Sequence, residues 1–104
     1  MSSPKYATSC VERFLEYVKY DTQSTEDSDT FPSTPSQLIF LQRLHDDLKV
    51  LGLDEVSRDT NGYVFATVPA TTAKQNVPEI GFLAHVETST EMSGKDDKAN
   101  IHEN

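Results

Sequence analysis

The sequence predicts an α/β fold in which two N-terminal helices are followed by a small sheet. Apolar residues recur three or four positions apart in two segments, roughly residues 8–20 and 36–51, which is the spacing of one face of a helix. Three later segments, around residues 55–58, 63–68 and 80–86, have the length and composition of strands. Two helical patterns followed by strand patterns indicate this fold class.

Each predicted helix carries one apolar stripe through which it is expected to pack. In the first helix the stripe consists of Val11, Phe14, Leu15 and Val18. In the second helix it consists of Leu38, Leu41, Leu44, Leu48 and Leu51, which are expected to be core residues. Thr34 or Ser33 can cap the second helix with Pro35 at its first position, and Gly52 is expected to stop it.

The third predicted strand, residues 80–86, is expected to be the most buried. It is apolar on both faces, whereas a sheet with one wet face would show alternation of apolar and polar residues. We therefore expect a three-stranded sheet on which the second helix packs through Leu41, Leu44 and Leu48. Asn61-Gly62 predicts a tight turn between the first two strands.

A histidine and a carboxylate lie where this apolar run stops. Side chains alternate across a strand, so His85 and Glu87 are expected to emerge side by side on one face. A neutral imidazole is a good zinc ligand, and a neighbouring carboxylate can accept its second ring N–H, which fixes the tautomer. Complete zinc sites need three or four ligands, so the ordinary alternative is a strand-end histidine that simply meets solvent.

Charge and cysteine content exclude several classes of protein. The formal charge of −8, from 17 acidic and 9 basic residues, argues against nucleic-acid binding, which depends on clustered Lys and Arg. Cys10 is the single cysteine, so an internal disulfide is impossible. No apolar stretch approaches the ~20 residues that span a bilayer. The chain is expected to be cytoplasmic, with neither nucleic acid nor membrane as a partner.

Other residues that could carry chemistry have simpler explanations. The acidic run at residues 26–29 is expected to be a solvated loop, because its spacing fits no oxygen-ligand loop for calcium. His45 is expected on the surface of the second helix, and His102 is expected to be an ordinary residue near the end of the chain. Cys10 is expected to be a packing or surface thiol rather than a nucleophile.

Short motifs occur in order along nearly all of the 104 residues. They are Glu12-Arg13-Phe14-Leu15-Glu16-Tyr17-Val18, Asp21-Thr22-Gln23-Ser24, Pro32-Ser33-Thr34, Leu51-Gly52-Leu53, the stretch 61–70, the stretch 77–89 around His85, and Ser93-Gly94-Lys95. In this order and at this spacing they resemble the peptidase T-like aminotripeptidases of the co-catalytic di-zinc exopeptidase superfamily. The motif at 21–24 and the block around His85 are the most specific.

The resemblance implies the N-terminal part of a zinc-exopeptidase catalytic domain, with a role for each member of the pair. His85 matches the family's first zinc-ligand histidine, and Glu87 matches the catalytic carboxylate that orients this histidine or tunes the metal. The family usually has aspartate at that position, so the carboxylate here stands on a side chain one methylene longer. The family's other ligands and its general-base glutamate lie beyond the point at which this sequence stops.

The implied reaction is the release of the N-terminal residue of a tripeptide by water activated between two zinc ions, with small peptides as substrates. Residues 1–104 would be an incomplete part of the catalytic domain, with 88–104 a loop or tail. The chain alone would be inactive, because at most one zinc ligand is present. Asp21, Thr22 and Ser24 are expected either to shape the site region or to cap the first helix and organise its loop.

A competing interpretation is a truncated, non-catalytic paralogue that acts as a binding or regulatory module. It has the same residues in 1–104, so the sequence does not separate the two. The oligomeric state is likewise not indicated by any motif.

Overall fold

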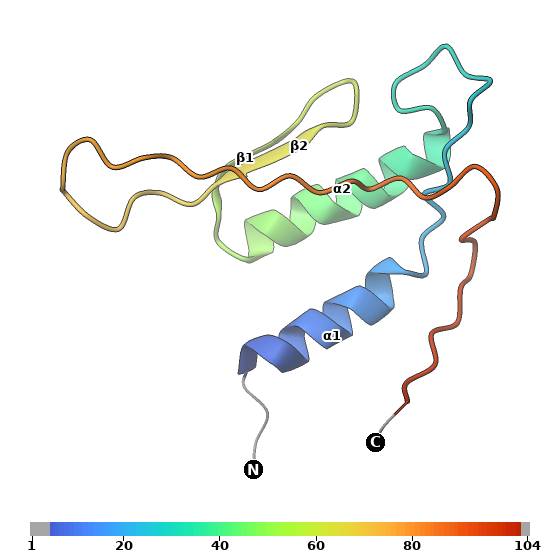
Figure 1. The fold of residues 1–104 in the computed structure, drawn as a ribbon, viewed down its shortest axis with the longest axis horizontal. Helices are drawn as coiled ribbons and strands as arrows, with labels where there is room; N and C mark the ends of the chain where they lie inside the picture. Colours follow the sequence, from blue (N-terminus) through green and yellow to red (C-terminus); the bar gives the residue numbers. More distant parts are fainter. Residues whose placement is uncertain (1–4, 103–104) are drawn as a thin grey trace.

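Two helices followed by one antiparallel hairpin make up the regular structure of the chain (Figure 1). The computed structural model describes residues 5–102. Its elements are α1 (Lys5–Tyr17), α2 (Pro35–Val50), β1 (Asp54–Arg58) and β2 (Val64–Thr67). The predicted class, two helices and then a small sheet, is confirmed. No helix in this part of the chain is long and apolar enough to cross a membrane.

The ends of α2 follow the signals in its sequence. Thr34 precedes the helix in an extended conformation, and Pro35 is its first residue. Proline suits this position because the first N–H groups of a helix have no partner inside the helix. Gly52 follows the C-terminal turn with a φ of 84° and donates a hydrogen bond to Lys49 O at 3.0 Å. Its positive φ ends the helix at low cost, as expected for glycine.

The first helix is offset from its prediction and packs differently. It ends at Tyr17, three residues earlier than expected, and the next residues tighten into a turn in which Tyr20 N donates to Tyr17 O. Val11 and Phe14, two members of the predicted packing stripe, are 51 % and 61 % exposed. The prediction that α1 packs through this whole stripe is therefore wrong. A periodic pattern defines an apolar face but does not supply the surface that covers it.

An aromatic cluster joins the first helix to the second. The Tyr17 ring meets Phe40 edge-on with centroids 5.0 Å apart, and Tyr20 lies 5.2 Å from the same ring. Edge-on and tilted pairs of this kind place the positive ring edge against the negative ring face. Phe40 and Leu41 are the buried apolar side chains in the described part of the chain. The core is therefore small and lies on α2.

Polar side chains around this aromatic cluster form a hydrogen-bonded network. The Tyr17 hydroxyl donates to Asp47 Oδ2 at 2.8 Å, and Arg43 Nε donates to both carboxylate oxygens of Asp47 at 3.0–3.1 Å. Arg43 Nη1 also donates to the Tyr20 hydroxyl at 3.2 Å. Four charged or polar groups, from α1, α2 and the turn at Tyr20, are thus satisfied by one another, which fixes the orientation of α1 against α2.

The predicted turn closes the hairpin, and Asp59, which was not predicted from the sequence, stabilises it. Gly62 adopts a φ of 90°, which suits the glycine of Asn61-Gly62. Asp59 Oδ1 accepts hydrogen bonds from Asn61 N at 3.0 Å and from Tyr63 N at 2.9 Å. The hairpin packs on α2, where Leu41 lies directly against Gly62.

Residues 80–86 do not form the predicted third strand. The sheet within residues 5–102 has two strands, and residues 80–86 run as an extended chain outside it. Phe82 and Leu83 are each 96 % exposed, and Ile80 is 78 % exposed. The prediction of a buried central strand covered by α2 is therefore wrong. A strand needs neighbours for its backbone N–H and C=O groups, and here β1 and β2 pair with each other while α2 covers them.

Replacing Gly62 by alanine should destabilise the fold more than the same change at Gly52 or Gly81. A Cβ on Gly62 would lie 2.8 Å from Leu41 Cδ1, and alanine would also be strained at the φ of +90° found there. Gly52 likewise has a positive φ, but a Cβ there would meet open space. Gly81 has neither a positive φ nor a close neighbour. We expect losses of roughly 2–3 kcal/mol at Gly62, about 1 kcal/mol at Gly52 and about zero at Gly81 in urea unfolding. Equal losses at Gly62 and Gly52 would show that Leu41 moves aside without cost.

Tyr17 is expected to make stability fall at high pH. Burial, and then the hydrogen bond to Asp47, raises the pKa of Tyr17 from 10.0 to about 12. Because the fold favours the protonated phenol, its contribution is complete below the unfolded pKa of 10.0 and is lost as pH rises toward 12. In Tyr17→Phe, urea unfolding should show a smaller decline over this range, by roughly 1–2 kcal/mol. Identical declines in the two proteins would contradict the assignment.

Candidate functional site

His85 and Glu87 contact each other through their side chains. They stand two residues apart on extended backbone, and Nδ1 of His85 lies 2.8 Å from Oε1 of Glu87. The predicted geometry, with both side chains on one side and the imidazole within reach of the carboxylate, is confirmed. The extra methylene of Glu87, compared with aspartate, is accommodated without loss of this contact.

The contact decides which nitrogen of His85 carries the proton. A carboxylate only accepts hydrogen bonds, so Nδ1–H is the donor to Glu87 and the lone pair of the neutral ring lies on Nε2. Nε2 has no hydrogen-bond partner among residues 5–102. The pKa of the Glu87 carboxyl is held below its usual range by a hydrogen bond from the Glu87 backbone N–H and, to a smaller extent, by the one from His85. The imidazole is therefore oriented with one nitrogen available to a metal ion.

Both side chains of the pair are open to water. The His85 side chain is 89 % exposed and that of Glu87 is 48 % exposed. Pairs in such positions are screened by solvent and are usually worth less than about 1 kcal/mol. The orientation of His85 is thus a preference and not a rigid constraint in this chain.

A short backbone bridge fixes the chain immediately after Glu87. Gln23 and Thr88 form an isolated parallel bridge, in which Thr88 N donates to Thr22 O and Ser24 N donates to Thr88 O, both at 3.1 Å. Ser24 Oγ also donates to Thr88 O at 2.9 Å, and Gln23 Nε2 donates to Thr90 O at 2.9 Å. We call this set of contacts the Thr22–Thr88 bridge. It fixes the backbone one residue beyond Glu87.

The beginning of α2 anchors the other side of this bridge. Gln37 Nε2 donates to Thr22 O at 3.1 Å, and Thr34 Oγ1 donates to Gln23 O at 2.8 Å. Gln37 is 4 % exposed and Thr22 is 6 % exposed, so these polar groups depend on each other rather than on water. The Thr34 hydroxyl therefore bonds to the loop at Gln23 and does not cap the N-terminus of α2.

Of the two roles considered for the motif at residues 21–24, the contacts favour support of the site region. Thr22 and Ser24 bond to Thr88, while Asp21 Oδ1 accepts from Gln23 N at 3.1 Å and organises the loop itself. Gln37 was not identified from the sequence, although a glutamine within an apolar helical segment is a signal of a buried hydrogen bond.

The described residues do not complete a metal site. No group of three His, Cys, Asp or Glu side chains that could hold a metal ion occurs within residues 5–102. His45 bonds to its neighbour Asp46, with Nδ1 3.0 Å from Oδ1, and lies on α2. The pair His85 and Glu87 therefore stands alone.

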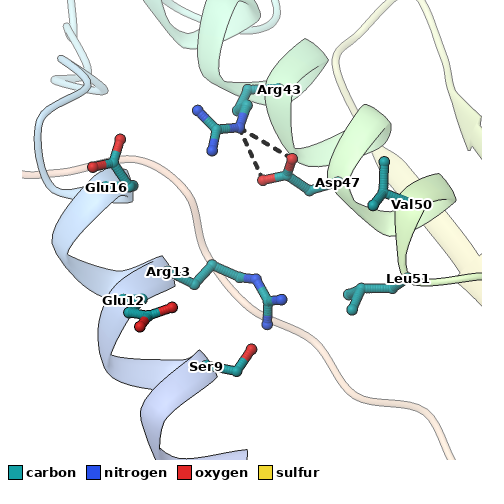
Figure 2. A pocket seen from close by; sticks show the side chains of 8 residues that line it. All are labelled: Ser9, Glu12, Arg13, Glu16, Arg43, Asp47, Val50 and Leu51. Carbon is teal, nitrogen blue, oxygen red and sulfur yellow. Dashed lines mark hydrogen bonds and ion pairs between the residues drawn. The ribbon is translucent and has the colours of Figure 1, made fainter.

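A hollow lies between α1 and α2, on segments that are distant in the sequence from His85 and Glu87. Figure 2 shows its lining side chains, with the Arg13 guanidinium reaching from α1 into the space between the helices. Its volume is about 270 Å³, and it is lined by Ser9, Glu12, Arg13, Glu16, Arg43, Asp47, Val50 and Leu51. The carboxylate of Asp47 is already paired with Arg43. The lining carries both signs of charge and no convergent set of ligands.

Comparison with known proteins gives one consistent result. The chain is 57 % identical over 94 residues to proteins named Peptidase T from Bacillus cereus (strain Q1), Bacillus thuringiensis (strain Al Hakam) and Bacillus anthracis. The match covers 90 % of this chain but 23 % of each relative, so the chain spans less than a quarter of the length of these proteins. No family model matches the chain. The resemblance inferred from the motifs is confirmed.

Substituting Glu87 should change the tautomer of His85. In Glu87→Gln the acceptor loses its charge, so the Nδ1–H form should fall a few-fold relative to Nε2–H, as expected for an exposed contact worth about 1 kcal/mol or less. Long-range ¹H–¹⁵N NMR at a pH where imidazole is neutral measures this ratio. His45, which has its own carboxylate partner in Asp46, is the control in the same spectrum. An unchanged His85 ratio would show that Glu87 does not orient the ring.

Proposed function

We propose that this chain is the N-terminal portion of a peptidase T-like aminotripeptidase and that His85 contributes to its zinc centre. The observation that carries the proposal is the imidazole held by Glu87 inside a sequence that is 57 % identical to Peptidase T over 94 residues. Any stretch of 94 residues in a chain of 104 includes positions 11–94, so the similarity spans both members of the pair.

The fit to zinc is partial. The Nδ1–H of His85 donates to Glu87, which leaves the lone pair of Nε2 to bind a metal ion. The same hydrogen bond raises the basicity of the ring, so that Nε2 donates its electron pair to a metal more strongly. Catalytic zinc sites take about three protein ligands, and residues 5–102 bring no third His, Cys, Asp or Glu to this pair. Zinc in a complete enzyme would supply an activated water for peptide hydrolysis. In this chain the residues present would hold and orient one ligand.

Glu87 acts in this proposal through His85. Its carboxylate keeps the proton on Nδ1 of His85, and the hydrogen bonds that it accepts from its own backbone N–H and from His85 lower its pKa. The Thr22–Thr88 bridge holds the backbone that follows, which limits how far Glu87 can move from the imidazole. Tripeptides are the substrates that the resemblance suggests, with hydrolysis at the N-terminal residue.

The alternative is a non-catalytic paralogue that acts as a binding or regulatory module. It is favoured by the exposed apolar surface of residues 80–86, which suits contact with another polypeptide. The two proposals differ in whether His85 matters for hydrolysis once the missing ligands are supplied.

We expect His85 to be required for hydrolysis only in a complete enzyme. The purified chain with added zinc, cobalt or manganese should release no more N-terminal amino acid from tripeptides than its His85→Ala variant, because one ligand forms no two-metal site. A chimera in which residues 11–94 replace the matching part of the Bacillus cereus protein should hydrolyse tripeptides. In that chimera His85→Ala should lower kcat/KM by roughly 10³-fold or more, and Glu87→Asp should preserve or raise zinc affinity.

The outcomes separate the alternatives. An active chimera that tolerates His85→Ala would refute the role of His85 while leaving the family resemblance intact. Metal-dependent turnover by the isolated chain, lost in His85→Ala, would show that the short chain completes a site by itself and would overturn the proposal that it is one part of a larger catalytic domain.

A further inference from the structure

Gln37 is a buried polar residue on the face of α2 that carries the core. It precedes Phe40 and Leu41 by three and four positions, so the three side chains share one face of the helix, and all three are buried. Burial of an amide costs free energy unless its groups are hydrogen-bonded. For packing alone an apolar side chain would suit this position better, so the contacts of the amide have to account for the glutamine.

The side-chain amide of Gln37 bonds to a carbonyl that also holds the C-terminal segment. Gln37 Nε2 donates to Thr22 O at 3.1 Å, and Thr88 N donates to the same oxygen at 3.1 Å. Because a carbonyl only accepts hydrogen bonds, this contact turns the NH₂ end of the amide toward Thr22. One oxygen atom thus joins α2 to the residue that follows Glu87.

This junction is important because residues 69–102 form few hydrogen bonds to the rest of the fold. The chain leaves β2, turns back after an excursion, and returns as one long extended stretch (Figure 1). Among the described residues, the hydrogen bonds that join 69–102 to 5–68 all involve residues 22–24. The position of His85 and Glu87 relative to the helices therefore depends on how firmly residues 22–24 are held.

Of the two side chains that tie residues 22–24 to α2, Gln37 is the better shielded from water. Thr34 Oγ1 donates to Gln23 O at 2.8 Å, but Thr34 precedes the helix and is only partly buried. Gln37 lies within the helix, and both it and its partner Thr22 are buried. Water competes least for such a contact, so it is the firmer of the two anchors.

We propose that Gln37 is a positioning residue for the candidate zinc centre. Its amide holds Thr22 O, and through the Thr22–Thr88 bridge it holds the backbone that keeps His85 and Glu87 on one side of the chain. This role rests on the function proposed above. Gln37 bonds to neither side chain of the pair within residues 5–102, so it acts through the bridge and not on the imidazole directly.

Gln37→Met tests this role, because methionine keeps the length of the side chain and lacks the donor. In the isolated chain the amides of Thr88 and Ser24 should exchange roughly 3- to 10-fold faster, which corresponds to the loss of one net hydrogen bond. The ratio of the Nδ1–H to the Nε2–H form of His85 should fall by about twofold, because a looser backbone lets Glu87 leave the ring.

Global stability should respond much less than the bridge does. Burial of methionine favours the folded chain, and it persists when the bridge opens while α2 stays packed, so it offsets the lost hydrogen bond only in global unfolding. Thr22 O also keeps Thr88 N as a donor. The unfolding equilibrium constant in urea should therefore change by less than about fivefold. A merely structural glutamine would instead accelerate exchange at all amides to the same degree.

Gln42→Met is the matched control. Gln42 is exposed on the same helix, where it bonds to Asp46 and Arg58 and not to the bridge. The same chemical change at this position should leave the exchange of Thr88 and the His85 ratio within about 1.5-fold of the unsubstituted chain.

Ser24→Ala weakens the same bridge from its exposed side and decides the question if Gln37→Met does not fold. Ser24 Oγ donates to Thr88 O at 2.9 Å, so its loss should speed exchange at Thr88 and lower the His85 ratio. Ser24→Thr keeps the hydroxyl and should restore both. Since each substitution loosens one shared bridge, the effects of Gln37→Met and Ser24→Ala should be less than additive.

The chimera described above extends the test to hydrolysis. Gln37→Met should lower kcat by roughly 5- to 20-fold and leave KM within about twofold, because a buried residue that acts on alignment contacts no substrate. Gln42→Met should change neither constant by more than about twofold.

Three results on the isolated chain would overturn the proposal. They are equal exchange of Thr88 in the Gln37→Met and unsubstituted chains, uniform acceleration of all amides in Gln37→Met, and a His85 ratio that neither Gln37→Met nor Ser24→Ala changes. An active chimera that keeps its kcat with Gln37→Met refutes the positioning role alone. An inactive chimera refutes the proposed function, and the measurements on the isolated chain then decide whether Gln37 holds the pair.

Discussion

The carbonyl oxygen of Thr22 is the acceptor on which the arrangement of the loop, α2 and the C-terminal segment depends. It receives one hydrogen bond from Gln37 Nε2 and one from Thr88 N, each at 3.1 Å. Thr22 and Gln37 are both buried, so loss of both donors would leave this carbonyl unsatisfied at a cost of about 1–3 kcal/mol. Two segments far apart in the sequence are thereby held to the start of one helix.

Polar contacts have this importance because little apolar surface is buried. Phe40 and Leu41 are the buried apolar residues of the described part of the chain, while Phe82 and Leu83 remain almost fully exposed. A chain of 104 residues has a high ratio of surface to volume, and here the apolar segments outnumber the surfaces that can cover them. This imbalance agrees with a match that covers 23 % of each relative.

The candidate site divides into a local part and a distant part. Contact between His85 and Glu87 needs only extended backbone and a spacing of two residues, and both are supplied by one short segment. A set of three or four metal ligands needs side chains from several elements, and residues 5–102 do not bring a third ligand to the pair. The orientation of one histidine is therefore present, and the described residues do not complete a metal centre around it.

The sequence by itself determined the features that depend on neighbouring residues: the span of α2 from Pro35 to its stop at Gly52, the glycine turn of the hairpin, and the contact between His85 and Glu87. Helical periodicity, positive φ and strand alternation act over a few positions, so the pattern is sufficient. Only the tertiary structure decided that residues 80–86 lie outside the sheet and that Gln37 meets the Thr22–Thr88 bridge. Burial and long-range hydrogen bonds require a partner surface. An apolar pattern indicates that a segment would be stabilised by burial, but it does not specify whether the same chain provides the surface that buries it.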